Sequence, residues 1–149
     1  MNIDLNILKA LLDDNKYRLS ILSNASAYLN ESIDNINWVG FYLLDKDTLY
    51  LGPFQGKPAC ILIPVGKGVC GDTVAKKQTI VVDNVLEYKG HIACDSNSRS
   101  EICIPLHIEG KTYGLLDIDS PIFNRFDDSL KNELIEASII IEEALEKAI

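Results

Sequence analysis

The sequence has no hydrophobic run long enough to cross a membrane. Its longest apolar stretches, residues 61–65 and 138–141, are far shorter than the roughly 20 residues that a bilayer-spanning helix needs. The first four residues have neither the basic charge nor the apolar stretch of a signal peptide. We therefore expect a cytoplasmic protein with no membrane partner.

Basic charge is also scarce. The chain has 14 Lys and Arg against 22 Asp and Glu, which gives a formal net charge of −8. The Lys and Arg residues form no cluster, so a nucleic acid or an anionic membrane surface would be repelled. We expect no nucleic-acid partner, and the surplus of acid mainly favours solubility.

The spacing typical of a zinc site is missing as well. No two cysteines form a CxxC pair, and His91 and His107 are far apart in the sequence. Permanent disulfide frameworks are rare in the cytoplasm. We therefore expect no metal and no other cofactor, and the cysteines are left with redox chemistry or core packing. They are Cys60, Cys70, Cys94 and Cys103.

The periodicity of apolar residues predicts a small number of elements. Intervals of three and four residues predict a helix over residues 5–29, with a break near 13–15, and a last helix beginning at 126–128. A further helix is expected over 69–77, and loops over 53–58 and 84–98. The predicted strands are residues 37–44, 48–52, 59–64, 79–83, 100–108 and 112–119.

This order of elements favours an α+β fold. The 149 residues are enough for one domain, 1–149, with a single core. We expect a central, mostly antiparallel sheet with the terminal helices packed on one face and the inserted loops on the other. The apolar faces of the terminal helices could also form a homodimer.

One cysteine stands in unusually polar surroundings. Cys94 follows a glycine-led segment, GHIA, and precedes Asp, Ser, Asn and Arg residues, with Glu101 seven positions later. A structural cysteine normally has apolar neighbours, so this context indicates an accessible and ionisable thiol. Polar loops beside a strand often carry function. Cys94 is therefore the first candidate for the reacting atom.

Strand alternation places two acids on one face. In residues 112–119, Tyr113, Leu115, Asp117 and Asp119 should point one way. A pair of carboxylates at i and i+2 can bind a cation, or raise one pKa enough to keep a transferable proton. The alternative is a strand that simply ends in solvent, where acids are common.

A second strand offers aromatic side chains. Trp38, Gly40 and Tyr42 should share a face, and the glycine beside the only tryptophan indicates one wall of a small pocket. An aromatic core strand explains the same residues equally well. The segment GKG at 66–68 is better explained as a turn into a helix than as a phosphate-binding loop.

The remaining cysteines differ in their contexts. Cys103 lies between two isoleucines, which indicates a buried structural role. Cys70 lies in the first turn of a predicted helix, where the helix dipole would lower a thiol pKa. Cys60 precedes a strand. From these residues alone, a thiol enzyme and a thiol-based sensor remain equally good explanations.

Several segments resemble the free methionine-(R)-sulfoxide reductases, which are built on a single GAF domain. The resemblance covers roughly residues 37–128, and the cysteine contexts with the acid-rich strand make it specific to these reductases. The segments are NWVGFY (37–42), LGPFQGKPAC (51–60), GKGVCG (66–71), GHIACDS (90–96), SRSE (98–101) and LDIDSP (116–121).

The resemblance implies specific roles. Cys94 would be the nucleophile, Cys60 the resolving thiol and Cys70 a further redox-capable thiol, while Cys103 occupies a position that is usually aliphatic in relatives. The substrate would be free methionine sulfoxide and the reductant thioredoxin. The implied substrate pocket consists of Trp38, Tyr42, Glu101, Asp117 and Asp119.

The implied chemistry suits these residues. The Cys94 thiolate would attack the sulfoxide sulfur while a carboxylic acid protonates the oxygen. Clustered acids would raise at least one pKa, and their remaining charge would hold the ammonium group. Cys94 would be left as a sulfenic acid that condenses with Cys60. The alternatives are a non-catalytic GAF sensor of a small ligand and a thiol redox switch without turnover.

Overall fold

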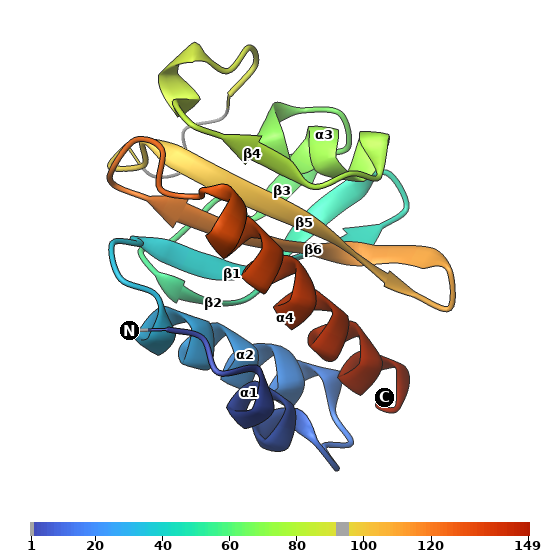
Figure 1. The fold of residues 1–149 in the computed structure, drawn as a ribbon. Helices are drawn as coiled ribbons and strands as arrows, with labels where there is room; N and C mark the ends of the chain where they lie inside the picture. The colour runs from blue at the N-terminus through green and yellow to red at the C-terminus, as the bar shows by residue number, and fades with distance from the viewer. Residues whose placement is uncertain (1, 92–95) are drawn as a thin grey trace.

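The fold is one six-stranded antiparallel sheet with helices on both faces (Figure 1). The computed structural model describes residues 2–91 and 96–149. The strand order is β3-β2-β1-β6-β5-β4, so that the two hairpins β1–β2 and β5–β6 lie side by side at the centre. The strands are β1 Trp38–Asp45, β2 Thr48–Gly56, β3 Leu62–Pro64, β4 Ile80–Val82, β5 Ser100–Ile108 and β6 Lys111–Ser120.

Three helices lie on one side of the sheet: α2 (Arg18–Ser32) and α4 (Asp128–Glu146) pack on it, and α1 (Leu5–Leu12) packs on the outer side of these two helices. Two of these helices begin at a capping aspartate. The Asp4 side chain accepts hydrogen bonds from backbone N–H groups in the first turn of α1, and the Asp127 side chain accepts one in the first turn of α4. The apolar faces of α2 and α4 are buried against the sheet, and that of α1 is buried against α2 and α4. The α+β architecture with its terminal helices on one face is thus confirmed, and the homodimer stays a prediction.

The N-terminal segment forms two helices, α1 and α2, separated at the break that the sequence predicts. Asp14 has a left-handed backbone, with φ of 58°. The C-terminus fixes the segment between the helices, because the Ile149 N–H donates to the Lys16 carbonyl and the Arg18 N–H to the Ile149 carbonyl, each at 2.8 Å. None of the helices in the described part of the chain has the length and apolar character needed to span a bilayer.

The strand β2 is longer than predicted, and β3 is shorter. Residues 53–56, expected in a loop, continue β2 against β1. The register shifts between Gly40 and Tyr42, and such an irregularity allows Pro53, which has no N–H to donate, to lie within a strand. Residues 59–61, expected in β3, precede it.

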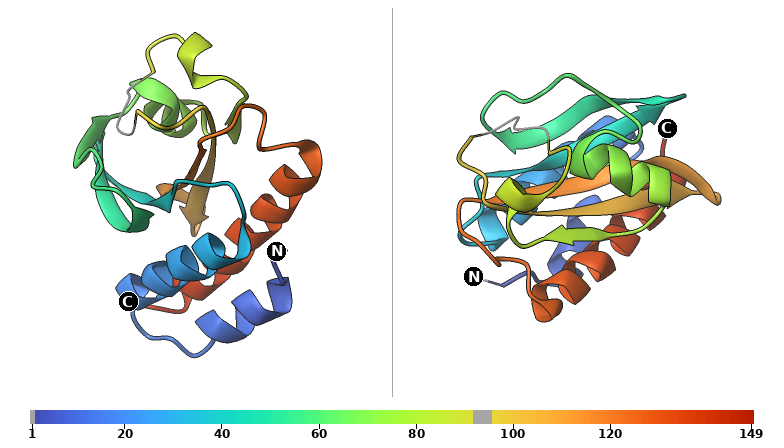
Figure 2. Two further views of the ribbon diagram at one scale, coloured as in Figure 1. Left: turned by 90° about the vertical axis from the view of Figure 1, so that its left-hand side faces the viewer. Right: turned by 90° about the horizontal axis from the view of Figure 1, so that it is seen from above.

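The opposite face carries α3 (Gly68–Lys76) and the 3-10 helix η1 (Val85–Glu87). The curled sheet surrounds α3 on this side (Figure 2). A second apolar cluster lies between α3 and the sheet, and it includes Trp38, Tyr42, Cys70 and Cys103. Most of the residues proposed for the site therefore lie on the face away from the terminal helices.

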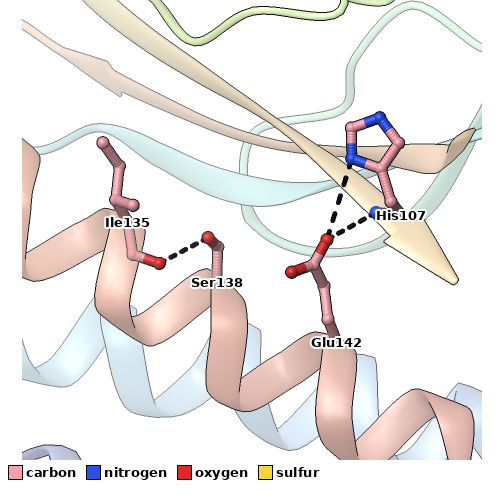
Figure 3. A network of polar contacts seen from close by, with 4 residues as sticks. All are labelled: His107, Ile135, Ser138 and Glu142. Carbon is pink, nitrogen blue, oxygen red and sulfur yellow. Dashed lines mark hydrogen bonds and ion pairs between the residues drawn. The ribbon is translucent and has the colours of Figure 1, made fainter. Parts of the chain in front are cut away.

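Helix α4 is fixed to β5 near the end of that strand (Figure 3). The Glu142 carboxylate accepts from the His107 backbone N–H and lies 3.9 Å from His107 Nδ1. The register of β5 with β6 shifts between Leu106 and His107. Beyond this bulge Tyr113 packs on the helix side, under Arg18, so its predicted position on the face of Leu115 is wrong.

Candidate functional site

Three neighbouring strands place the candidate site residues in two adjacent rows. Along β1, β6 and β5, Trp38 lies beside Asp119, and Asp119 lies beside Glu101. All three project from the face that α3 covers, because alternate residues of each strand share a face. The next row, two residues along each strand, contains Gly40, Asp117 and Cys103.

Two thiols and two carboxyl groups meet under the N-terminus of α3. The Cys70 and Cys103 sulfurs are 3.5 Å apart. Glu101 Oε2 lies 3.8 Å from Cys70 Sγ and 3.5 Å from Cys103 Sγ, while Asp117 Oδ1 lies 3.4 Å from Cys103 Sγ. All four residues are buried, and we call them the thiol–acid cluster.

The two acids of the thiol–acid cluster retain protons more readily than ordinary carboxyl groups. Burial raises the pKa of Glu101 well above its usual value, and the charge of Asp117 raises it further. Burial likewise raises the pKa of Asp117, with an additional contribution from the charge of Asp119. The expected rise in an acid pKa is therefore found for both residues.

The two thiols are held in their neutral form. The hydrogen bond with Cys103 lowers the pKa of Cys70, but burial and the charge of Glu101 outweigh it, so the pKa is raised. Burial raises the pKa of Cys103 well above its usual value. The expectation that the helix dipole lowers the Cys70 pKa is thus wrong, because α3 begins inside the protein beside two acids.

Aromatic rings form the wall opposite these acids. Trp38 stacks on Tyr42 and on Phe54, with ring centroids 5.9 Å and 5.2 Å apart. The expected gap at Gly40 is filled, because a Cβ there would lie 2.3 Å from the Phe54 Cβ and 2.8 Å from the Trp38 ring. The Trp38 indole N–H donates to the Lys57 carbonyl at 3.2 Å, which orients the ring.

Helix α3 approaches the sheet closely because one of its residues has no side chain. A Cβ at Gly71 would lie 2.6 Å from the Pro64 carbonyl oxygen. The Gly71 N–H also donates to the Lys67 carbonyl, and the Gly71 carbonyl accepts from the Gly66 N–H. These two hydrogen bonds join the helix to the turn before it. Gly71 therefore allows α3 to bring Cys70 to the acids.

These elements enclose one pocket, with an empty volume of about 530 Å³ that includes open solvent at its mouth. Six of the residues proposed from the sequence line it: Trp38, Tyr42, Cys70, Glu101, Asp117 and Asp119.

Some residues at this site were not singled out from the sequence. Lys67, His91 and Ser98 also line the pocket, and burial lowers the pKa of His91. Cys103 forms the base of the thiol–acid cluster. Its i+2 spacing from Glu101 indicates a shared strand face, a signal that its isoleucine neighbours obscured.

Of the other two cysteines, Cys60 is described by the structure and Cys94 is not. The Tyr42 hydroxyl donates to the Cys60 carbonyl at 2.8 Å, so the backbone of Cys60 lies at the pocket wall. Cys60 is disulfide-bonded, whereas Cys70 and Cys103 are free thiols. Cys94 lies outside the described residues, between His91 and Ser98 in the sequence.

The GAF-domain model matches residues 17–137 of this chain. The free methionine-R-sulfoxide reductase of Escherichia coli (strain K12) is 48% identical over 145 residues, which are 97% of this chain and 86% of that protein. The chain belongs to the GAF-domain family of free methionine-R-sulfoxide reductases.

Solved structures of this reductase family agree with the fold. The fRMsr of Staphylococcus aureus, in complex with substrate, has a TM-score of 0.89 and 50% identity, with 97% of both chains covered. The Neisseria meningitidis free methionine-R-sulfoxide reductase, in complex with its substrate, has a TM-score of 0.93 and 42% identity, with 97% of this chain and 87% of that chain covered.

The geometry of the pocket supports two kinds of chemistry. Buried carboxyl groups with raised pKa values can donate a proton to a bound molecule. Carboxylate charge beside aromatic rings can bind a cationic, partly apolar ligand. A pocket of this shape therefore suits a small amino acid.

Proposed function

We propose that this protein reduces the (R)-sulfoxide of free methionine to methionine. The observation that carries the proposal is the pair of buried acids, Glu101 and Asp117, which keep a raised pKa in a pocket walled by Trp38. Membership of the reductase family supports the reaction, since relatives are named for it.

Substrate binding would use both sides of the pocket. The negative charge that remains among Glu101, Asp117 and Asp119 holds the ammonium group of the free amino acid. Trp38, stacked between Tyr42 and Phe54, packs against the S-methyl group. A methionine sulfoxide within a peptide chain lacks this ammonium group, so we expect it to be rejected.

The chemical step would use Cys94 as the nucleophile. Its thiolate attacks the sulfoxide sulfur while the Glu101–Asp117 pair donates a proton to the oxygen. The protonated oxygen then transfers from the sulfoxide sulfur to Cys94 Sγ, while the bond between the two sulfurs breaks and its electron pair goes to the methionine sulfur. Methionine leaves, and Cys94 is left as a sulfenic acid. His91 and Ser98, on either side of Cys94 in the sequence, both line the pocket, which supports this assignment.

Resolution would use Cys60. Its thiol condenses with the Cys94 sulfenic acid, which forms a disulfide and releases water. Cys60 is disulfide-bonded, which supports a redox role for its thiol. Thioredoxin of the cytoplasm then reduces the disulfide by thiol exchange. Cys70 remains a further redox-capable thiol in this scheme.

The decisive assay is thioredoxin-coupled NADPH consumption with free methionine (R)-sulfoxide. We expect turnover by the wild type and none by Cys94→Ser, whose fold is checked by circular dichroism. Binding of the sulfoxide without turnover would favour the GAF sensor instead. Peroxide-dependent thiol oxidation without turnover would favour the redox switch, and methionine release by Cys94→Ser at the wild-type rate would remove Cys94 as the nucleophile.

A further inference from the structure

We propose that the thiol–acid cluster binds a soft divalent cation of the zinc class, with two sulfur and two oxygen ligands. The ligand atoms of Cys70, Glu101, Cys103 and Asp117 all lie within 4.8 Å of one another. Such a site goes beyond reductase activity. It was not expected from the sequence, because its ligands come from a strand pair and a helix rather than from one short motif.

The measured separations match a tetrahedral zinc site. Zinc bonds of about 2.3 Å to sulfur and about 2.0 Å to oxygen give edges of about 3.8 Å between sulfurs and about 3.5 Å between sulfur and oxygen. The sulfur–sulfur distance here is 3.5 Å, and three of the four sulfur–oxygen distances are 3.4, 3.5 and 3.8 Å. Four of the six edges therefore lie within about 0.3 Å of the tetrahedral values, and the other two, which join Asp117 to Cys70 and to Glu101, are no longer than 4.8 Å.

Three rigid elements hold these ligands in place. Glu101 and Cys103 are alternate residues of β5, and Asp117 is the direct partner of Cys103 on β6. Cys70 is in the first turn of α3, which packs against both strands. A site on regular elements costs little conformational entropy to organise, so the apoprotein is already close to the binding geometry.

The ligand types select a soft cation. Magnesium and calcium prefer oxygen alone, whereas two thiolates favour zinc or cadmium. Two thiolates and two carboxylates leave the same net charge around zinc as the four thiolates of an all-cysteine zinc site. Lys67, which lines the pocket above, adds a positive charge nearby.

The cation would enter through the substrate pocket. Cys70, Glu101 and Asp117 line that pocket, whereas Cys103 is fully buried behind them. A bound cation would occupy the two acids that the proposed function assigns to proton donation and ammonium binding. If that function holds, zinc should therefore compete with methionine sulfoxide and raise its KM.

The test is a Cd²⁺ titration of the metal-stripped protein with the Cys60 disulfide intact. Cys70 and Cys103 are the free thiols of the described residues, and as ligands they would give the ultraviolet thiolate-to-cadmium charge-transfer band. We expect one Cd²⁺ per chain, displaced by an equal amount of Zn²⁺. Absence of the band in the wild type would overturn the proposal, whatever the variants do.

Variants then locate the site. Cys103→Val should weaken Cd²⁺ binding by more than the about 10- to 100-fold that loss of an outer-shell partner costs. Asp117→Asn provides a second variant if Cys103→Val does not fold, as judged by circular dichroism. The matched control is His107→Gln, which removes a histidine–carboxylate pair on the opposite, helix-covered face and should leave the titration unchanged.

Two results would place the cation elsewhere and overturn the proposal. One is a wild-type Cd²⁺ affinity in Cys103→Val or Asp117→Asn, and the other is loss of the charge-transfer band in His107→Gln. Zinc inhibition is measured separately from binding. A chain that binds Cd²⁺ stoichiometrically but has no reductase activity would contradict the proposed function and leave the metal site standing.

Discussion

Asp117 shows how one residue's surroundings change its chemistry. Its partner on β5 is Cys103 and its partner on β1 is Gly40, so it has neighbours on both sides and α3 above. Asp117 is only 5% exposed. If β6 simply ended in solvent, which is the alternative explanation for its acids, Asp117 would be exposed. The position of β6 in the middle of the sheet excludes that alternative.

Asp117→Asn should change the pH dependence of stability. Because burial raises the folded-state pKa of Asp117, the unfolded chain ionises first, near its usual pKa of about 3.9. The wild type therefore loses stability as the pH rises from about 4 towards the raised pKa. The asparagine variant lacks this loss, and a one-unit pKa difference corresponds to about 1.4 kcal/mol.

Urea unfolding at pH 4 and pH 7 measures this effect. We compare the free energy of unfolding of Asp117→Asn with that of the wild type at each pH. The difference, variant minus wild type, should increase by on the order of 1 kcal/mol or more from pH 4 to pH 7. Asp45→Asn, at an exposed position where β1 ends, is the matched control and should show no such change. An identical pH profile for Asp117→Asn and wild type would contradict the raised pKa.

Cys60→Ser tests the assignment of the resolving thiol. The variant keeps Cys94 and the acids, so it should release about one methionine per chain and then stall, because no thiol condenses with the sulfenic acid at the normal rate. Rapid-quench measurement of methionine against time shows the single burst. Continued turnover with thioredoxin, or peptide mapping of oxidised wild type that joins Cys94 to Cys70, would exclude Cys60 as the resolver.

At the scale of elements, Gly71 fixes the position of α3. We expect Gly71→Ala to destabilise the protein by about 1–3 kcal/mol, the usual cost of overpacking, because its Cβ meets the Pro64 carbonyl. The displaced helix should also raise the KM for the sulfoxide. Lys76→Ala, at an exposed position of the same helix, should stay within about 0.5 kcal/mol of the wild type. Thermal unfolding and steady-state kinetics check both variants.

The strands were predictable where alternation and turns define them. The hairpin β5–β6 has a short polar turn and nearly the predicted bounds. The end of β2 was not predictable, because a proline and two glycines indicate a loop. Only the pairing with β1 shows that a bulge in β2 accommodates these residues within the strand. The misplacement of Tyr113 has the same cause, since Tyr113 is the extra residue of a bulge in β6 that only the pairing with β5 reveals.

The site was predictable in its composition more than in its geometry. The resemblance named Trp38, Tyr42 and the three acids, and all of these line the pocket. The contact of Cys70 with Cys103 joins a helix to a strand 33 residues later, and no local pattern encodes that distance. The protonation of both thiols follows from burial and from the charge of the neighbouring acids, so it too required the structure.

At the scale of the whole molecule, the pocket lies between the sheet and α3 in the interior of one domain, and its acids are almost wholly buried. Glu101 and Asp117 are each 5% exposed. A ligand that enters must compensate for the negative charge that remains among these acids and Asp119, because solvent cannot. The folded chain therefore favours a substrate with a free ammonium group.

N-acetyl methionine sulfoxide is the probe for this selectivity, since it keeps the sulfoxide and the carboxylate and loses only the ammonium charge. Loss of one partner of a buried charge pair costs on the order of 2–5 kcal/mol. Because about 1.4 kcal/mol is tenfold, we expect kcat/KM to fall roughly 30-fold or more against free methionine (R)-sulfoxide. The coupled NADPH assay measures both substrates, with the enzyme's reduction by dithiothreitol as a control for the thioredoxin step. Equal kcat/KM values would mean that the acids do not bind the amino group, and the protein would then be a general sulfoxide reductase.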